Sequence, residues 1–223
     1  IYGPSIARML GLPKDQRPEI VDEKMFQPVE AHGLATMSMA YLTAEQTPMV
    51  WRGPMAAGAL QQLLEQTLWG ELDILIVDMP PGTGDIQLTL AQKASISGAV
   101  IVTTPQNIAL LDARKGIEMF AKVKIPVLGV VENMATHICS QCGHEEAIFG
   151  YGGGYDIAQQ YQTALLGSLP LDSSIREHGD NGLPSVLADA ESKITDSYLQ
   201  IAEKVITQLQ NVGNHTVPNI VFH

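Results

Sequence analysis

The strongest constraint on the fold is an alternation of short apolar runs with segments of helical periodicity. The apolar runs have the length of buried strands and cover residues 72–78, 99–104, 127–131 and 164–168. Apolar residues at helical spacing predict helices over residues 54–68, 109–122 and 198–209. Strands that alternate with helices are typical of parallel strands joined by crossover helices, so we predict an α/β fold.

The domain organisation is predicted from the absence of repeats and linkers in the sequence. The 223 residues show no internal repeat, low-complexity tract or linker, which favours one domain over residues 1–212. Residues 213–223 have no periodic pattern, so we predict a loosely ordered tail. The least regular internal stretch, residues 136–154, contains both cysteines of the chain. Exposed excursions of this kind are where binding groups tend to lie.

Charge and cysteine content narrow the class of protein. Thirteen basic against 24 acidic residues give a net charge of −11, which repels phosphate backbones and anionic lipids. We therefore expect no nucleic-acid and no membrane partner. The apolar runs are too short to cross a bilayer, and residues 1–4 do not resemble a secretory signal. Two cysteines provide no disulfide framework, so we expect a cytoplasmic protein.

The first constellation with chemical meaning is Asp-Met-Pro-Pro-Gly-Thr-Gly-Asp at residues 78–85, directly after a predicted buried strand. An acid at the carboxyl end of such a strand, here Asp78, can hold a water of a hydrated magnesium ion. Gly82 and Gly84, with two prolines, predict a tight turn whose N–H groups approach a γ-phosphate. This is typical of a nucleotide-sensing switch loop. An ordinary turn with Asp78 as a helix cap fits the same pattern.

The second constellation is Cys139-Ser140-Gln141-Cys142. Two intervening residues let both thiolates point at one metal centre, yet two thiolates complete neither a zinc site nor a cubane iron–sulfur site. A two-fold dimer would supply the missing pair, because its interface brings identical residues together. Zinc held within the loop or across a dimer, a redox pair, and two ordinary loop thiols are the alternatives. We interpret His137 and His144 as solvent-facing or hydrogen-bonding rather than as ligands.

Ten short segments in unbroken order are similar to the Mrp/ApbC iron–sulfur carrier ATPases: residues 1–5, 51–55, 78–85, 87–92, 103–106, 131–134, 139–143, 148–150, 169–172 and 175–177. The resemblance implies a P-loop NTPase fold related to MinD and the nitrogenase iron protein, with a twisted sheet covered by helices on both faces. It also implies a homodimer that transfers a [4Fe–4S] cluster to apoproteins, coupled to ATP and Mg²⁺. A MinD/ParA-like positioning ATPase and a non-catalytic zinc-bridged dimer are the alternative functions.

Residue roles follow from the same resemblance. Cys139 and Cys142 would ligate the cluster, Asp78 would lie near magnesium, and Gly82 and Gly84 would form the switch backbone. Asn133 follows a predicted strand where related ATPases place an asparagine that reads the base, and its amide can both donate to and accept from adenine. Three further residues would lie beside the same ring: Pro170, Leu171 and Asp172.

One departure from the family pattern concerns phosphate binding. The family has a glycine-rich loop ending in Gly-Lys-Ser/Thr before the segment that matches residues 1–5, and this sequence contains no such loop. Without that lysine and its N–H cradle, a triphosphate loses most of its counter-charge. We therefore expect the sequence to be a portion of a longer ATPase that lacks the first strand and the P-loop, and to be inactive alone.

Overall fold

The computed structural model describes residues 5–22, 24–42, 53–80, 82 and 84–213. The chain divides into two compact units: Ile1–Lys93 with Arg176–Pro184, and Ala94–Ile175 with Ser185–His223. Parts of the segments that carry the resemblance, residues 1–4, 51–52, 81 and 83, lie outside the described residues. The predicted tail beyond residue 213 does so as well. The assignment of residues 1–212 to one domain stays a prediction.

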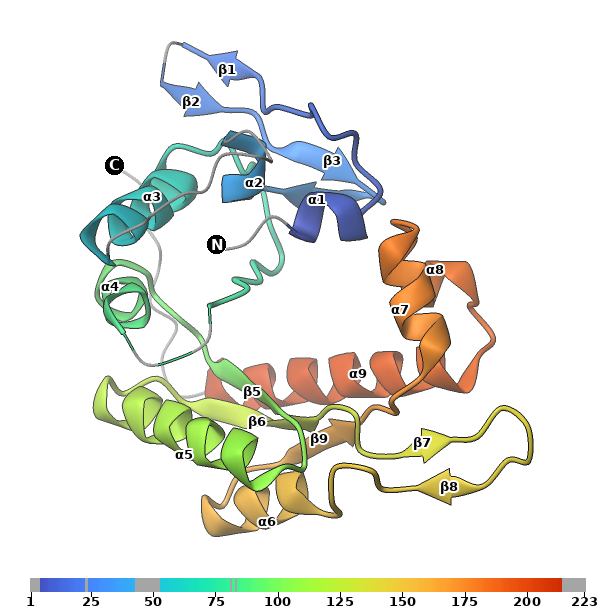
Figure 1. Ribbon diagram of the computed structural model, residues 1–223. Coiled ribbons are helices and arrows are strands. Elements are labelled where there is room, and N and C mark those ends of the chain that lie inside the picture. Colours follow the sequence, from blue (N-terminus) through green and yellow to red (C-terminus); the bar gives the residue numbers. More distant parts are fainter. Residues whose placement is uncertain (1–4, 23, 43–52, 81, 83, 214–223) are drawn as a thin grey trace. The chain divides into compact units, whose positions relative to one another are not determined.

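A parallel sheet forms the centre of the second unit. Its strands are β5 (Ala99–Thr103), β6 (Val127–Glu132) and β9 (Leu165–Ser168), in the order β5-β6-β9 (Figure 1). Every residue of β6 after the first is buried. A central parallel strand is covered on both faces, which explains why its sequence is continuously apolar rather than alternating. Three of the predicted strands are therefore confirmed.

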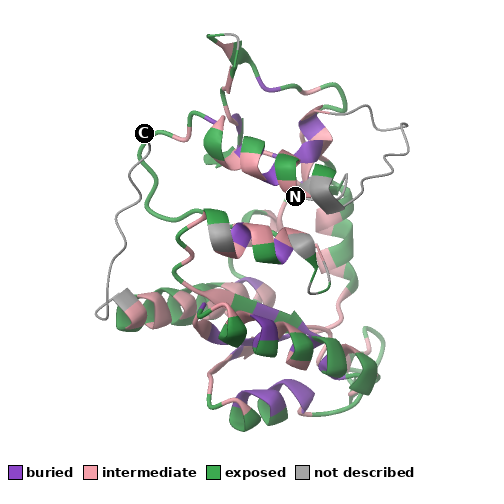
Figure 2. Ribbon diagram, turned by 90° about the vertical axis from the view of Figure 1, so that its left-hand side faces the viewer, coloured by how far each residue is buried: buried purple, intermediate pink, exposed green. Residues whose placement is uncertain are grey.

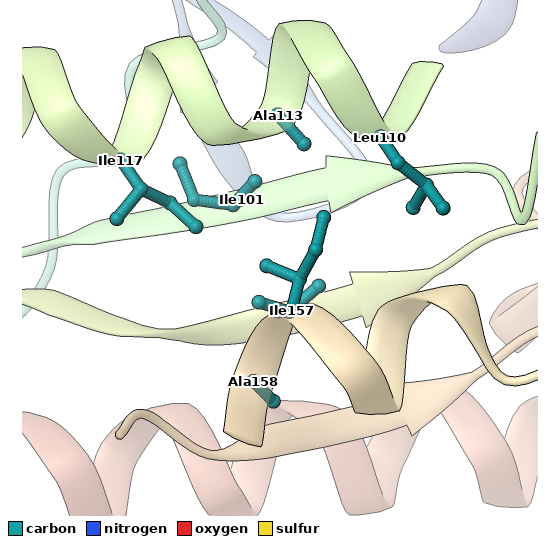
Figure 3. Packing of buried hydrophobic residues seen from close by; sticks show 7 residues of the cluster. Ile101, Leu110, Ala113, Ile117, Ile157 and Ala158 are labelled. Carbon is teal, nitrogen blue, oxygen red and sulfur yellow. The ribbon is translucent and has the colours of Figure 1, made fainter. Parts of the chain in front are cut away.

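Helices cover both faces of this sheet. On one face, α5 (Asn107–Lys122) and α6 (Gly153–Gln160) pack against the strands. Figure 3 shows the buried cluster that results: Ile101, Leu110, Ala113, Ile117, Val130, Ile157 and Ala158. On the other face, α9 (Lys193–Gly213) packs on a second cluster through Tyr198, Ile201 and Val205. Successive strand residues point to opposite faces, so Val130 belongs to the first cluster and Val131 to the second.

The predicted fold class, an α/β protein with a parallel sheet between helices, is thus confirmed in this unit. The α6 helix carries its buried residues on one side and exposed residues on the other (Figure 2). Each fully buried Leu or Ile side chain contributes about 1.5–3 kcal/mol relative to exposure. Among the described residues, no helix is both long and apolar enough to cross a membrane.

The first unit contains short hairpins and helices. Its elements are α1 (Ser5–Met9), β1 (Ile20–Val21), β2 (Met25–Phe26), β3 (Val29–Ala31), β4 (Leu34–Thr36), α2 (Met39–Leu42), α3 (Gly53–Glu65) and α4 (Asp85–Lys93). His32 and Gly33 connect β3 to β4 with φ of 51° and 77°. A tight hairpin favours such positive φ values, since their twist matches that of the strands. The predicted helix over residues 54–68 is confirmed as α3, although it ends at Glu65. The other short helices in the described part of the chain are α7 (Ser173–Asp180) and α8 (Ser185–Ala188).

The predicted buried strand over residues 72–78 is wrong for the described structure. No strand is formed there, and Ile74, Leu75 and Ile76 are exposed, Ile76 by 86%. A strand requires a neighbour whose backbone groups pair with its own N–H and C=O groups. No described strand pairs with these residues, so their apolar and β-branched composition is not sufficient to make a strand.

Candidate functional site

The Cys-x-x-Cys motif lies at the end of a short hairpin that extends from the sheet (Figure 1). The hairpin arms are β7 (His137–Ile138) and β8 (Glu145–Glu146), which pair antiparallel. Its loop is closed by the Cys139 N–H, which donates to the carbonyl of His144 at 2.8 Å. The Gly143 N–H donates back to the carbonyl of Cys139, also at 2.8 Å. These two bonds give the cysteine loop a defined backbone in place of the irregular excursion that the sequence indicated.

Both thiols are unpaired and accessible. Cys139 is partly exposed and Cys142 is exposed. The backbone N–H groups of Gln141 and Cys142 point at the Cys139 sulfur and lower its pKa from the usual value, and the Cys142 thiol and the charge of His137 act in the same direction. A thiolate is the form that ligates metal, so the loop favours the reactive state of Cys139. Within the described residues, no group of three or more His, Cys, Asp or Glu side chains is placed to hold a metal ion.

The hydrogen-bonding interpretation of His137 is confirmed. Its Nδ1 lies 3.1 Å from the carbonyl oxygen of Leu171. A carbonyl only accepts, so Nδ1 is the donor in this bond. His144, on the opposite arm of the loop, is exposed.

Asn133 lies at the carboxyl edge of the parallel sheet. Its N–H donates to the carbonyl of Thr103, the last residue of β5, at 2.7 Å. Its side-chain Oδ1 accepts a 3.0 Å bond from the N–H of Met134. The amide nitrogen of Asn133 is therefore the group that can donate to a ligand. The prediction that Asn133 follows a strand is confirmed. Ligands of open α/β sheets bind at this edge, and a role of Asn133 in binding the base stays a prediction.

The structure brings the segment of Pro170, Leu171 and Asp172 beside the residues that follow β6. The Ala135 N–H donates to the carbonyl of Leu169 at 2.9 Å, and the Leu171 N–H donates to that of Thr136 at 2.8 Å.

Asp172 has a structural role that was not predicted from the sequence. Its Oδ1 accepts from the Ser174 N–H at 2.8 Å and the Ser174 hydroxyl at 2.6 Å, so it caps α7. An Asp just before a helical segment is the ordinary signal of such a cap.

The three predicted switch residues belong to the first unit, whereas the cysteines and Asn133 belong to the second. Gly82 has φ of 104°, a conformation that favours glycine, and its neighbours in the predicted tight turn, residues 81 and 83, lie outside the described residues. Asp78 is exposed, and Gly84 precedes α4. The buried side chain of Gln87 donates through Nε2 to the carbonyl of Pro80 at 2.9 Å and so fixes the turn to the helix. The nucleotide role of Asp78, Gly82 and Gly84 stays a prediction.

Glu132 is a buried carboxylate that the sequence analysis did not single out. It ends β6, and its Oε1 accepts a 2.8 Å bond from the N–H of Gly154 in the first turn of α6. The N-cap residue Gly152 has no side chain, so Glu132 supplies the acceptor and places negative charge at the positive end of the helix dipole. A Cβ on residue 154 would lie 2.8 Å from the Cβ of Glu132. Gly154 therefore allows α6 to approach β6 closely.

Comparison with solved structures supports the α/β class of the fold. A solved nucleotide-binding protein from Archaeoglobus fulgidus, in complex with ADP, has a TM-score of 0.70 and 34% sequence identity to this chain. The likeness covers 87% of this chain and 74% of the archaeal one.

The sequence model of the ParA group described as NUBPL iron-transfer P-loop NTPase matches residues 1–206. An iron-sulfur cluster carrier protein of Pseudomonas fragi is 62% identical over 202 residues, which cover 91% of this chain and 70% of that protein. The protein of the same name from Escherichia coli K12 is 57% identical over 222 residues, or 100% of this chain and 60% of that protein. The chain belongs to the NUBPL iron-transfer P-loop NTPase family. It spans 60% to 70% of the length of these two relatives.

Proposed function

We propose that this protein binds an iron–sulfur cluster as cargo on Cys139 and Cys142 and transfers it to apoproteins. The observation that carries the proposal is the pair of accessible thiols on an ordered, protruding hairpin. Exposure lets an acceptor protein reach the cluster, and the lowered pKa of Cys139 favours the ligating thiolate. The names of the bacterial relatives support the same cargo. Unpaired cysteines also agree with a reducing, cytoplasmic location.

The proposed cargo is a [4Fe–4S] cluster shared by two copies of the chain. Such a cluster takes four thiolates, and each chain offers two. A two-fold axis through the hairpin would place Cys139 and Cys142 of one protomer opposite the same residues of its partner. A homodimer therefore completes the site without a third ligand from either chain.

Nucleotide is the second proposed ligand, with ATP hydrolysis as the energy source in the complete protein. The residues present fit it: Asn133 offers an amide donor at the sheet edge, and Leu171 and Pro170 lie on the adjoining segment. For the first unit we propose separately that Asp78 offers a carboxylate for a water of Mg²⁺ and that the backbone at Gly82 and Gly84 binds phosphate. ATP would supply a phosphoanhydride bond, and Asn133 with residues 170–172 would orient its base.

The cargo proposal is tested by anaerobic reconstitution with iron and sulfide of the wild-type protein and three variants. Cys139→Ala and Cys142→Ala should each abolish the broad visible absorption of iron–thiolate charge transfer, while far-UV circular dichroism is unchanged because both residues lie in an exposed loop. Ser140→Ala, between them in the same loop, should retain the absorption.

Iron analysis and light scattering complete the test. We expect about four iron atoms per dimer. A colourless protein with tightly bound zinc would support the zinc-bridged scaffold instead. A monomer that holds the full cluster would contradict the shared site.

A further inference from the structure

The cysteine hairpin and the predicted base-binding segment are joined by a continuous series of hydrogen bonds. The parallel ladder between β6 and β9 does not stop where the strands end. The Leu169 N–H donates to the carbonyl of Glu132 at 2.9 Å, and the Ala135 N–H donates to that of Leu169 at 2.9 Å. The Leu171 N–H then donates to the carbonyl of Thr136 at 2.8 Å. The two chain segments therefore stay hydrogen-bonded up to the base of the hairpin, with an irregular register where Met134 has a positive φ of 56°.

His137 is the residue at which this series meets the hairpin. Its backbone pairs with Glu146 as part of β7, and its ring donates through Nδ1 to the carbonyl of Leu171. The ring thus donates to the Leu171 carbonyl, which would accept from a backbone N–H if the ladder continued. Its partner, Leu171, is the middle residue of the segment proposed to flank the base. Two residues further along the chain is Cys139, whose own N–H closes the loop.

We propose that His137 is a positioning residue that transmits nucleotide occupancy from residues 170–172 to the Cys139–Cys142 loop. The inference rests on the proposed nucleotide role of Asn133 and Leu171. A ligand held by that segment restrains the Leu171 carbonyl, and the His137 bond passes the restraint to the β7–β8 pairing. The ring acts through another residue and touches neither reacting atoms nor the base.

Hydrogen exchange of the hairpin amides, measured on the complete native protein in its cluster-free form with and without MgADP, tests the coupling. In the wild type, saturating MgADP should slow exchange of the Cys139 and Gly143 amides by about fivefold or more, the lower end of ordinary allosteric coupling. His137→Leu removes the donor and should abolish this response while MgADP still binds. His137→Gln, which moves the amide nitrogen one bond further from the backbone, should do the same and serves if the Leu variant does not fold.

The matched rescue is His137→Asn, because the Asn amide nitrogen stands where the histidine Nδ1 stands. His137→Asn should keep the slowing of amide exchange by MgADP, and so should His144→Leu on the other arm. A purely structural role would speed exchange in both states and leave the MgADP response intact, which would overturn the proposal. An unchanged response in both His137→Leu and His137→Gln would also overturn it. MgADP binding without any response in the wild type would overturn this inference alone, whereas no binding would also remove the proposed nucleotide role.

Discussion

Residues 72–77 and strand β6 are alike in sequence and opposite in structure. Both are apolar runs that lead to an acidic residue, Asp78 in one and Glu132 in the other. Val130 in β6 is 0% exposed, whereas Ile76 is 86% exposed. The strand has hydrogen-bonded neighbours on both sides and helices on both faces, and residues 72–77 have no described strand partner. Apolar composition therefore indicates a tendency to be buried, and long-range partners decide whether burial occurs.

The largest expected effect comes from placing a charge in each run. Val130→Asp should lower the free energy of unfolding by about 4 kcal/mol or more, because an unpaired carboxylate would be buried between the sheet and α5 and α6. Ile76→Asp should change it by less than about 0.5 kcal/mol. Urea denaturation followed by circular dichroism measures both. Equal losses would break the comparison, since they would show that residues 72–77 are buried in solution.

The acidic residues at the ends of the two runs should differ as well, by a smaller amount. Glu132→Ala should cost about 1–3 kcal/mol, because the buried Gly154 N–H loses its acceptor. Glu132→Gln should cost less, since its amide oxygen can still accept that bond. Asp78→Ala, at an exposed side chain, should stay within about 0.5 kcal/mol. Urea denaturation measures the free energy of unfolding of each variant. A Glu132→Gln protein as unstable as Glu132→Ala would contradict the capping role.

The smallest effect concerns the cysteine loop, whose backbone, unlike residues 72–77, belongs to a strand hairpin closed by two hydrogen bonds. The lowered pKa of Cys139 means that its thiolate persists to lower pH than that of an ordinary thiol, whose pKa is about 8.5. In a Cys142→Ala protein, iodoacetamide should therefore modify Cys139 at pH 7 faster than it modifies free N-acetylcysteine. Gln141→Pro removes the first N–H donor and should slow the reaction. A rate no faster than that of the free thiol would contradict the prediction.

Part of the site was predictable because its signals are local. The spacing of Cys139 and Cys142 indicated a pair that can act together. Gly82 and Gly84 indicated a tight turn, and Gly82 has a positive φ. Glu132 was not predictable in the same way, because its partner Gly154 lies 22 residues along the chain. The Asp172 cap had a local signal that a functional interpretation of the same residue obscured. An aspartate fits both a helix cap and a binding role, and the sequence alone does not distinguish the two.

The amino-acid pattern was sufficient to predict the α/β class, three of the strands, the main helices and the cysteine pair. These depend on periodicity and spacing, which express how each short segment divides its side chains between core and solvent. Three findings required the folded structure: residues 72–77 form no described strand, Glu132 caps α6, and the His137 ring contacts Leu171. Each of these depends on which distant segment satisfies a given backbone or side-chain group, and no local pattern specifies that partner.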